Sequence, residues 1–332
     1  MIVANFFHIK ASNGLFFYGL DYVHENLANV RKALVRPALE AVARKALPGC
    51  EIVVCNGKGF LREVWRAQRL GDFLFTPTSH PLPGITRQWV VVHDAYPFFG
   101  QRGVLKRALL RVSLATSRCT VAYINRSDAR AFVAAMGVSE RRQVFAPNRF
   151  PAPAPATRPA SRAAGAQLVV GLVGTDSAKK NYAQLFDALR ATGAGRELAF
   201  RIYGHASPYF LALKAQYPDV DMTLVQSDSS SLEQFLSEVH VLASAAEQEG
   251  FGRPIAAALL AGFPVFLVDG PVFREFFSEG AEFHSDVHGL VAALLRAAMV
   301  AAAAPGYHAP PEVVRAYALA NSELGRLGKV ST

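Results

Sequence analysis

The chain of 332 residues contains few cysteines, and their spacing excludes the common cysteine-based sites. Cys50, Cys55 and Cys119 are the only three, and no two of them form a CxxC motif. Disulfide-rich secreted domains and zinc fingers use more cysteines at closer spacing. We therefore expect three reduced core thiols in a cytoplasmic protein. No His/Cys cluster has the spacing of metal ligands either, so we expect neither a bound metal nor a cofactor.

Long apolar runs and a targeting leader are also missing. The longest apolar run, residues 290–304, is shorter than the roughly 20 residues that cross a bilayer, and it contains Arg296. Residues 1–7 lack a basic leader and have the pattern of a first strand. We expect a soluble cytoplasmic protein, or one that lies peripherally on the inner face of the cytoplasmic membrane. No Gly-x-Gly-x-x-Gly motif follows the first strand of either half, which disfavours a dinucleotide-dependent oxidoreductase.

Acidic residues are scarce in the first half of the chain. The net charge is +9, but residues 1–150 hold 21 basic and 9 acidic side chains, whereas residues 167–332 hold 12 and 17. This imbalance indicates that the first half meets an anionic partner, which leaves nucleic acid, anionic lipid and a phosphorylated acceptor open. Nucleic acid is disfavoured because no aromatic stacking platform or recognisable binding motif accompanies the charge.

Residues 151–166, PAPAPATRPASRAAGA, form a Pro/Ala-rich linker without apolar periodicity. We therefore place an N-terminal domain at 1–150 and a C-terminal domain at 167–332, whose last helix can pack back on the first. Short apolar runs alternate with helical patterns on both sides of the linker, which predicts parallel sheets covered by helices. The predicted fold is α/β, with two Rossmann-like parallel-sheet domains facing a central cleft.

The apolar runs and periodic stretches give the expected elements. Expected strands are residues 2–9, 51–55, 73–76, 88–93, 120–124 and 143–146, then 168–173, 199–203, 221–225, 239–244 and 264–268. Expected helices are residues 15–47 (broken at Pro37), 60–70, 104–117 and 127–136, then 182–191, 208–217, 232–236, 254–260 and 287–303.

The loop after the strand at 239–244 carries the most informative motif, Glu249–Gly250–Phe251–Gly252–Arg253–Pro254. Pro254 suits the first turn of a helix, and the two glycines let the backbone approach a ligand closely. The N–H groups at the start of that helix favour a diphosphate. Glu249 lies just ahead of them and can accept hydrogen bonds from sugar hydroxyls. A plain strand–turn–helix with an exposed acid fits these residues equally well.

Two further loops contain residues that suit a site. The loop after the strand at 168–173 contains the adjacent pair Lys179 and Lys180. Two neighbouring lysines after a strand end can clamp a phosphate, and a solvated turn is the alternative. His93 closes the apolar strand at 88–93 and is followed by Asp94 and Pro97. That position favours a site residue over a core histidine.

Together these segments resemble the retaining group 1 family (GT4) of the GT-B glycosyltransferases. Residues 249–254 are similar to the family's EGFGLP turn, and residues 173–181 to its VGT…RKN loop. Residues 92–97 are similar to its HDxxP segment, and residues 145–148 to the IPN that ends the N-terminal domain. Weaker matches are Gly14, where the family has a glycine-rich loop, and Gly204. The matches follow the family's order along the chain.

The resemblance implies transfer from a nucleoside-diphosphate sugar donor. It implies that basic side chains and a helix dipole, rather than a metal, stabilise the leaving diphosphate. Retention of configuration would use the donor's own phosphate as base, with Glu249 and His93 orienting the hexose. The resemblance assigns catalysis to Glu249, His93 and Lys180, and donor binding to Gly14, Gly174, Thr175, Lys179, Lys180, Asn181, Gly204, Gly250, Phe251, Gly252, Arg253 and Glu275.

The sequence departs from the family pattern at the second of its two glutamates. Counting from Glu249, that glutamate falls on position 257, which is Ala257. In the family it holds the ribose hydroxyls through up to two hydrogen bonds, each worth about 1.5–3 kcal/mol. Three explanations stay open: ribose is held elsewhere, with Glu275 as the candidate; the donor binds weakly; or activity is lost. Arg253 replaces a leucine and can contact phosphate or acceptor, and Thr175 replaces an arginine.

The acceptor is expected to bind the basic N-terminal domain. Residues 102–118 form an amphipathic basic helix that can lie on an anionic membrane, and a cationic solvent-facing helix is the alternative. Its cations are Arg102, Lys106, Arg107, Arg111 and Arg118. The leading interpretation is a hexosyl- or deoxyhexosyltransferase acting on a cell-envelope glycan, such as lipopolysaccharide, O-antigen or a lipid-linked oligosaccharide. The alternative is a glycosyltransferase-like protein that binds sugar nucleotides with weak turnover or none.

Overall fold

The computed structural model describes residues 1–99, 103–117, 119–152, 165–300 and 306–329. The chain divides into two compact units, which are described separately: Met1–Arg149 with Pro310–Thr332, and Phe150–Ala309. The first unit is therefore discontinuous in sequence, because the end of the predicted second domain is grouped with it. Residues 153–164 of the predicted linker lie outside the described residues.

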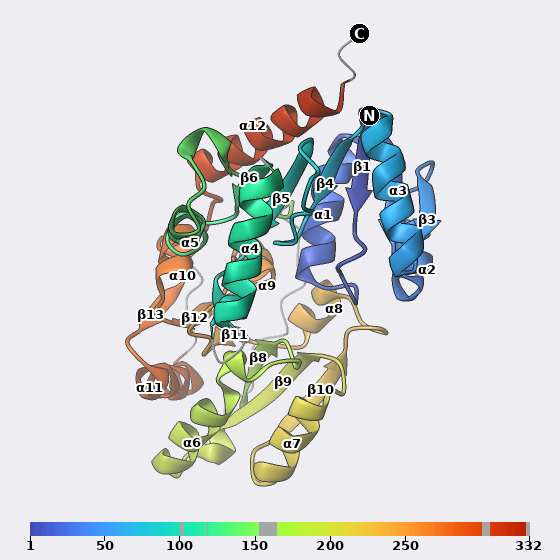
Figure 1. The fold of residues 1–332 in the computed structure, drawn as a ribbon. Coiled ribbons are helices and arrows are strands. Elements are labelled where there is room, and N and C mark those ends of the chain that lie inside the picture. The colour runs from blue at the N-terminus through green and yellow to red at the C-terminus, as the bar shows by residue number, and fades with distance from the viewer. Residues whose placement is uncertain (100–102, 118, 153–164, 301–305, 330–332) are drawn as a thin grey trace. The chain divides into compact units, whose positions relative to one another are not determined.

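A parallel sheet of seven strands forms the centre of the first unit (Figure 1), in the order β3-β2-β1-β4-β5-β6-β7. Every residue of β1, β4 and β5 is buried, as expected for strands covered by helices on both faces. The predicted strand at 2–9 ends at Asn5, and the residues after it form a loop. The strands are β1 (Ile2–Asn5), β2 (Val30–Val35), β3 (Glu51–Val54), β4 (Phe73–Thr76), β5 (Gln88–Val92), β6 (Thr120–Tyr123) and β7 (Gln143–Phe145).

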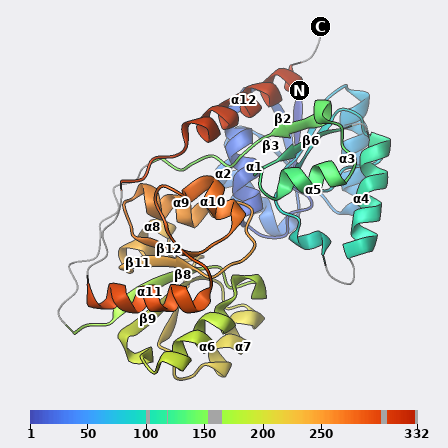
Figure 2. The ribbon, with the colours of Figure 1, turned by 90° about the vertical axis from the view of Figure 1, so that its left-hand side faces the viewer.

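Six α-helices are described in the first unit, and the last of them comes from the far end of the chain. Helix α12 (Pro311–Gly328) lies along this unit in both views (Figures 1 and 2), where Asn26 Nδ2 donates to Asn321 Oδ1 at 2.6 Å. A side chain at Gly328 would collide with Ile2 of β1, so glycine allows the close approach. The other helices are α1 (Gly14–Glu25), α2 (Glu40–Ala46), α3 (Gly57–Arg69), α4 (Gly103–Ser117) and α5 (Ala129–Ala135).

The prediction of a helix over residues 15–47 is wrong in its centre, where β2 runs between β1 and β3. This strand was not predicted because it contains Arg31 and Lys32, and a six-residue segment with two cations lacks the apolar pattern of a buried strand. Lys32 is nevertheless 4% exposed, since its ammonium group pairs with Glu63 of α3. Burial of this cation therefore depends on a partner that no local pattern reveals.

The second unit is built on a parallel sheet of six strands in the order β10-β9-β8-β11-β12-β13. Helices α6 and α11 pack beside one another against the sheet, and their leucines fill its core. The strands are β8 (Leu168–Val173), β9 (Leu198–Gly204), β10 (Met222–Gln226), β11 (Val241–Ser244), β12 (Val265–Val268) and β13 (Glu282–His284). The helices are α6 (Tyr182–Thr192), α7 (Pro208–Gln216), α8 (Leu232–Ser237), α9 (Arg253–Leu260), α10 (Pro271–Phe277) and α11 (Val287–Met299).

The predicted pair of parallel α/β sheets is confirmed. Strand β8 has the predicted bounds, whereas β13 and α10 were not predicted. Residues 301–303, the predicted end of the helix at 287–303, lie outside the described residues. Cys50, Cys55 and Cys119 are free thiols.

Candidate functional site

The strand order of the second sheet defines where a ligand would bind. Strands β9 and β10 lie on one side of β8, whereas β11 to β13 lie on the other. Loops that leave neighbouring strands in opposite directions open a crevice beyond their carboxyl ends, where α/β proteins bind ligands. The two loops at this point are residues 174–181 after β8 and residues 245–252 after β11, which contain most of the predicted donor-binding residues.

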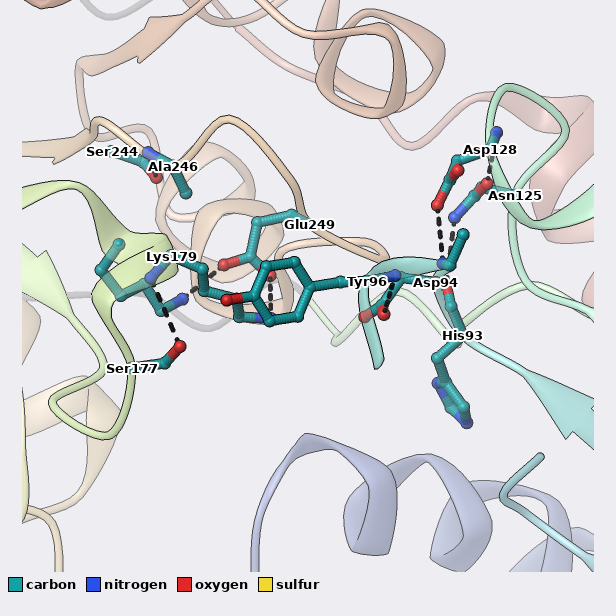
Figure 3. A network of polar contacts seen from close by, with 12 residues as sticks. His93, Asp94, Tyr96, Asn125, Asp128, Ser177, Lys179, Ser244, Ala246 and Glu249 are labelled. Atoms are coloured by element: carbon teal, nitrogen blue, oxygen red, sulfur yellow. Dashed lines mark hydrogen bonds and ion pairs between the residues drawn. The ribbon is translucent and has the colours of Figure 1, made fainter. Parts of the chain in front are cut away.

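Glu249 and two lysines join these loops (Figure 3). Lys180 Nζ donates to Glu249 Oε1 at 2.5 Å, and Lys179 Nζ lies 4.0 Å from Glu249 Oε2. The Glu249, Lys180 and Lys179 side chains are 15%, 17% and 22% exposed. The structure thus brings together three side chains that the sequence placed in separate motifs.

The two lysines set the ionisation of Glu249. Burial acts to raise the pKa of its carboxyl group, but the charges of Lys180 and Lys179 and the hydrogen bond from Lys180 outweigh burial and hold that pKa below its usual value. The carboxylate is therefore ionised at neutral pH and can only accept hydrogen bonds. With two cations and one anion, these three side chains keep a net positive charge.

Gly174 makes room for Lys180. Its φ of +100° lies in the region that favours glycine, and a Cβ there would lie 2.5 Å from Lys180 Cε. Its N–H donates to Tyr203 O at 2.9 Å, which fixes the turn after β8 against β9. Gly174 is therefore needed for the backbone conformation and for the path of the lysine side chain.

Asn181 is the only non-glycine residue with positive φ in the described part of the chain, at 60°. It occupies the N-cap position of α6 without a capping hydrogen bond from its side chain, and its Nδ2 lies 3.4 Å from Glu247 Oε1 of the other loop. A left-handed conformation at asparagine costs less than at most residues but is still unfavourable. Asn181 and Glu247 thus add a second link between the two loops, and Glu247 was not among the predicted site residues.

Thr175 and Gly204 lie behind these loops. Thr175 is 3% exposed, and its hydroxyl accepts a hydrogen bond from His205 N–H at 2.9 Å. A Cβ at Gly204 would lie 2.5 Å from Thr175 Oγ1, so glycine allows this packing. The Ser207 hydroxyl donates to Thr175 O. In this structure the two predicted donor-binding residues fix the loop after β8 to β9.

The turn at 250–253 combines an anchor with a helix start. Phe251 is 3% exposed and packs edge-on against Phe276, with ring centroids 4.8 Å apart. Gly252 has φ +94° and precedes α9, whose first residues are Arg253 and Pro254. Gly250 is buried, whereas Arg253 is half-buried. The Phe251 ring therefore holds the turn while the first turn of α9 directs its N–H groups toward the loop.

Comparison with known proteins identifies this unit. Residues 154–302 match the family model described as glycosyl transferases group 1. Because this match covers most of the second unit, we call that unit the group 1 domain. Both the resemblance to this family and the GT-B fold predicted from the sequence are confirmed. No match was found among curated proteins.

Solved structures similar to the whole chain are also GT-B glycosyltransferases. HepE from Anabaena, in complex with UDP-glucose, matches with a TM-score of 0.67 and 15% identity over 98% of this chain and 97% of its own. The lipopolysaccharide outer core galactosyltransferase WaaB matches with a TM-score of 0.58 and 15% identity, over 99% and 100%. A glycosyltransferase from Rickettsia africae matches with a TM-score of 0.65 and 12% identity, over 98% and 93%. At these identities the likeness shows the fold.

In the group 1 domain, the position of the absent glutamate lies on α9. Ala257 is half-buried there, one helix turn beyond Arg253. Glu275, the predicted substitute for ribose binding, lies half-buried on α10, which follows β12. The roles of Ala257 and Glu275 toward a donor stay predictions.

Two more polar side chains lie at the carboxyl edge of the group 1 domain and were not predicted. His205 follows β9 and Asp228 follows β10, with His205 Nδ1 3.4 Å from Asp228 Oδ2. Both side chains are exposed. Their positions after adjacent strands would have been the sequence signal, but neither residue belongs to a motif.

The described residues of the group 1 domain and of the first unit contain no group of three or more His, Cys, Asp or Glu side chains that could hold a metal ion. The sequence has one Asp-x-Asp triplet, at Asp219 and Asp221. It precedes β10, so it lies at the amino end of the strand, and its carboxylates pair with Arg190 at 2.9 Å and Arg201 at 4.0 Å. The triplet is therefore outside the candidate site.

His93 follows β5 in the first unit and is held from several sides (Figure 3). Its Nε2 donates to Pro77 O at 3.0 Å, and its ring packs edge-on against Tyr18 at 4.7 Å. Asn125 Nδ2 donates to His93 O at 3.3 Å, and Asp128 Oδ2 accepts from Ala95 N–H at 3.1 Å. Because a carbonyl oxygen only accepts, the ring proton is on Nε2. These contacts hold the loop in place, and the catalytic role of His93 stays a prediction.

Gly14 begins α1 after β1 and is exposed. Asn13 caps the helix, since its Oδ1 accepts from Leu15 N–H at 3.1 Å and from Phe16 N–H at 3.4 Å. A Cβ at Gly14 would have no atom within 4 Å. Packing within the chain therefore does not require glycine at this position.

Proposed function

We propose that the protein transfers a hexose or deoxyhexose, with retention of configuration, from a nucleoside-diphosphate sugar to a cell-envelope glycan. The acceptor classes are lipopolysaccharide or O-antigen and lipid-linked oligosaccharide. The Glu249–Lys180 pair at the switch point of the group 1 domain carries the proposal, because it offers an ionised acceptor group beside two cations. The UDP-glucose complex of HepE, which has the same fold, supports a nucleotide-sugar donor.

The proposed chemistry follows from this charge pattern. The bond from the anomeric carbon to the diphosphate breaks as an acceptor hydroxyl oxygen bonds to that carbon and gives its proton to the leaving phosphate. The negative charge that develops on the leaving group is stabilised by Lys179, Lys180 and the first turn of α9. The Glu249 carboxylate accepts hydrogen bonds from the sugar hydroxyls and orients the ring. No metal takes part in this scheme, and a transfer rate unchanged by excess EDTA is the expected result.

A screen for the donor tests the first step. Thermal unfolding of the whole chain is measured with UDP-, GDP-, dTDP- and ADP-sugars, since a ligand of the folded state raises the Tm by mass action. We expect one base to stabilise the protein and Glu249→Gln to lower hydrolysis or transfer of that donor at least about tenfold, the equivalent of about 1.4 kcal/mol. The control is Glu233→Gln, an exposed position on α8. Full transfer by Glu249→Gln would overturn the assignment.

The alternative is a glycosyltransferase-like protein that binds sugar nucleotides with weak turnover or none, and Ala257 is the observation that favours it. This alternative differs from the leading proposal in predicting donor binding without turnover. A donor sugar would raise the Tm of the wild type, but no hydrolysis or transfer would follow with any acceptor preparation. Ala257→Glu would then restore ribose contacts and tighten donor binding.

Helix α4 supports the proposal that the protein is cytoplasmic and lies on the inner face of the cytoplasmic membrane. At about 100° per residue, its exposed apolar side chains share one side of the helix, flanked by Lys106 and Arg111. None of the described helices is long and apolar enough to cross a membrane. Arg102 and Arg118, predicted to extend the basic face, lie outside the described residues. The apolar side chains are Val104, Leu105, Leu109 and Val112, which are 66%, 65%, 60% and 61% exposed.

Vesicle co-sedimentation tests this surface. We expect binding to vesicles that contain phosphatidylglycerol, little binding to phosphatidylcholine alone, and a loss in the double variant Leu105→Gln/Leu109→Gln. The matched control is Leu211→Gln, an exposed leucine of α7. Binding that ignores anionic lipid, or that survives the double variant, would refute the membrane proposal.

A further inference from the structure

A cluster of rings and cations lies at the carboxyl edge of the first unit's sheet, outside the residues discussed so far. The neighbouring strands β3, β2, β1 and β4 all end at this edge, where parallel α/β sheets bind ligands. The loops after them, with the start of α3, supply five side chains that we call the His8–His80 cluster. They are Phe7, His8, Arg36, Phe60 and His80.

Ring stacking holds the cluster together. The imidazoles of His8 and His80 stack with centroids 4.6 Å apart and planes 6° from parallel. Phe7 stacks on Phe60 at 4.3 Å, and Phe60 meets His8 edge-on at 5.4 Å. Three segments that are far apart in sequence, one of them the first turn of α3, therefore converge on one arrangement.

Arg36 provides a permanent cation in this arrangement. Its guanidinium carbon lies 4.7 Å from the centroid of Phe7, and its Nε donates to Phe7 O at 2.7 Å. That bond uses Nε, so the two Nη groups remain for an oxyanion, which guanidinium groups bind in a bidentate way.

Among the described residues, the groups that shift the pKa values of the two histidines include no negative charge. Burial, His80 and Arg36 lower the pKa of His8 to about 4, and burial and Lys106 lower the pKa of His80. The charged groups that act on the pair are thus all cations. The His8 Nε2 atom is also buried without a hydrogen-bond partner among the described residues. An unsatisfied buried nitrogen among cations is a feature that a bound anion would explain.

We propose that the His8–His80 cluster binds an oxyanion of the acceptor, a phosphate or a carboxylate, with Arg36, His8 and His80 as its counter-charges. This inference rests on the proposed function, because it names the chemistry of the acceptor of that transfer. The excess of basic over acidic side chains in residues 1–150 agrees with an anionic ligand on this unit. Because the anion favours the protonated imidazoles, its binding takes up protons.

Histidine ring NMR on the full chain tests the site directly, with inorganic phosphate and sulfate as probes. We expect the ring signals of His8 and His80 to move on titration and their apparent pKa values to rise. Those signals are assigned with His8→Gln and His80→Gln. Sulfate keeps its charge, so its affinity should fall as the pH rises from about 5 to about 8. Signals of both rings that stay unchanged over the millimolar range would overturn the proposal.

Variants separate this site from the donor site. Arg36→Gln should weaken sulfate binding at least about tenfold, as expected for the loss of one charge-assisted contact. His288→Gln, an exposed histidine of the second unit, is the control and should leave it unchanged. Stabilisation of Arg36→Gln by the donor nucleotide should equal that of the wild type. If no nucleotide stabilises any variant, the proposed function fails while the ring signals still decide the anion site.

Two sugar ligands identify the source of the oxyanion. Glucose 6-phosphate and glucuronate are compared with glucose by the same ring signals. Binding of one anionic sugar at least about tenfold tighter than glucose supports the proposal and names the group. Equal responses to all three would contradict it. If Arg36→Gln does not fold, His80→Gln replaces it and should weaken sulfate binding.

Discussion

Replacing Gly174 with alanine tests how the donor site is built. The new Cβ would lie 2.5 Å from Lys180 Cε, so the lysine side chain must leave the position in which it pairs with Glu249. The φ of +100° adds a backbone cost of roughly 1–2 kcal/mol for alanine. We therefore expect two effects, a lower free energy of unfolding and a displaced ammonium group.

The displaced ammonium group sets the size of the second effect. A hydrogen bond to a charged group is worth about 1.5–3 kcal/mol, so donor affinity should fall about tenfold to a hundredfold. Isothermal titration with the donor found in the thermal screen measures the loss of donor affinity, and urea unfolding measures the loss of stability.

Gly193→Ala is the matched control. Gly193 also has positive φ, at +68°, but a Cβ there has no atom within 4 Å. The Gly193→Ala variant should lose only the stability that the strained backbone conformation costs, and it should keep wild-type donor affinity. If both variants bind the donor equally well, Gly174 does not position Lys180, and the reasoning is refuted.

Three further predictions concern residues that support the two sheets. Lys32→Met should lower the free energy of unfolding by up to about 3–5 kcal/mol, because it leaves the buried Glu63 carboxylate with only the exposed Arg62, whose Nε lies 3.7 Å from Glu63 Oε1. The double variant Lys32→Met/Glu63→Gln should lose less stability, and equal urea midpoints of the single and double variants would contradict this. The hydrogen bond from Lys32 lowers the pKa of Glu63 despite burial, so this carboxylate stabilises the fold above its unfolded pKa near 4.5. That contribution should vanish as the pH falls through the lower folded pKa, and the stability gap between wild type and Glu63→Gln should narrow from about pH 5 to about pH 3. Gly204→Ala should displace Thr175, whose Oγ1 lies 2.5 Å from the new Cβ, and lower the Tm, whereas Gly195→Ala, with no atom within 4 Å, should not.

Elements whose burial follows from their own residues are predicted from the sequence, whereas elements whose burial depends on a residue far along the chain are not. Strand β8 was predicted with its exact bounds because its six residues are apolar or glycine, as expected of a strand buried on both faces. Strand β2 was missed because Lys32 is buried only through Glu63, which lies 31 residues further on. No local pattern contains that pairing.

The candidate site shows the same division. Motifs placed Glu249 and Lys180 in one site, but their ion pair depends on β8 and β11 being neighbours in the sheet. The order of the strands along the sequence does not reveal that pairing. The link from Asn181 to Glu247 and the stack of His8 on His80 have no motif at all. Their partners lie 66 residues apart in the first case and on different strands' loops in the second.

Helix α12 has a consequence for how the protein is made. It packs on the first unit, where the Tyr317 hydroxyl donates to Glu25 Oε1 at 3.1 Å, but residues 150–309 of the second unit are synthesised before it. At about 5–20 residues per second, a ribosome needs roughly ten to thirty seconds for that segment. During this interval the nascent first unit lacks its cover over Ile2 and Asn26. The second unit can therefore complete its fold before the first, although the first begins earlier.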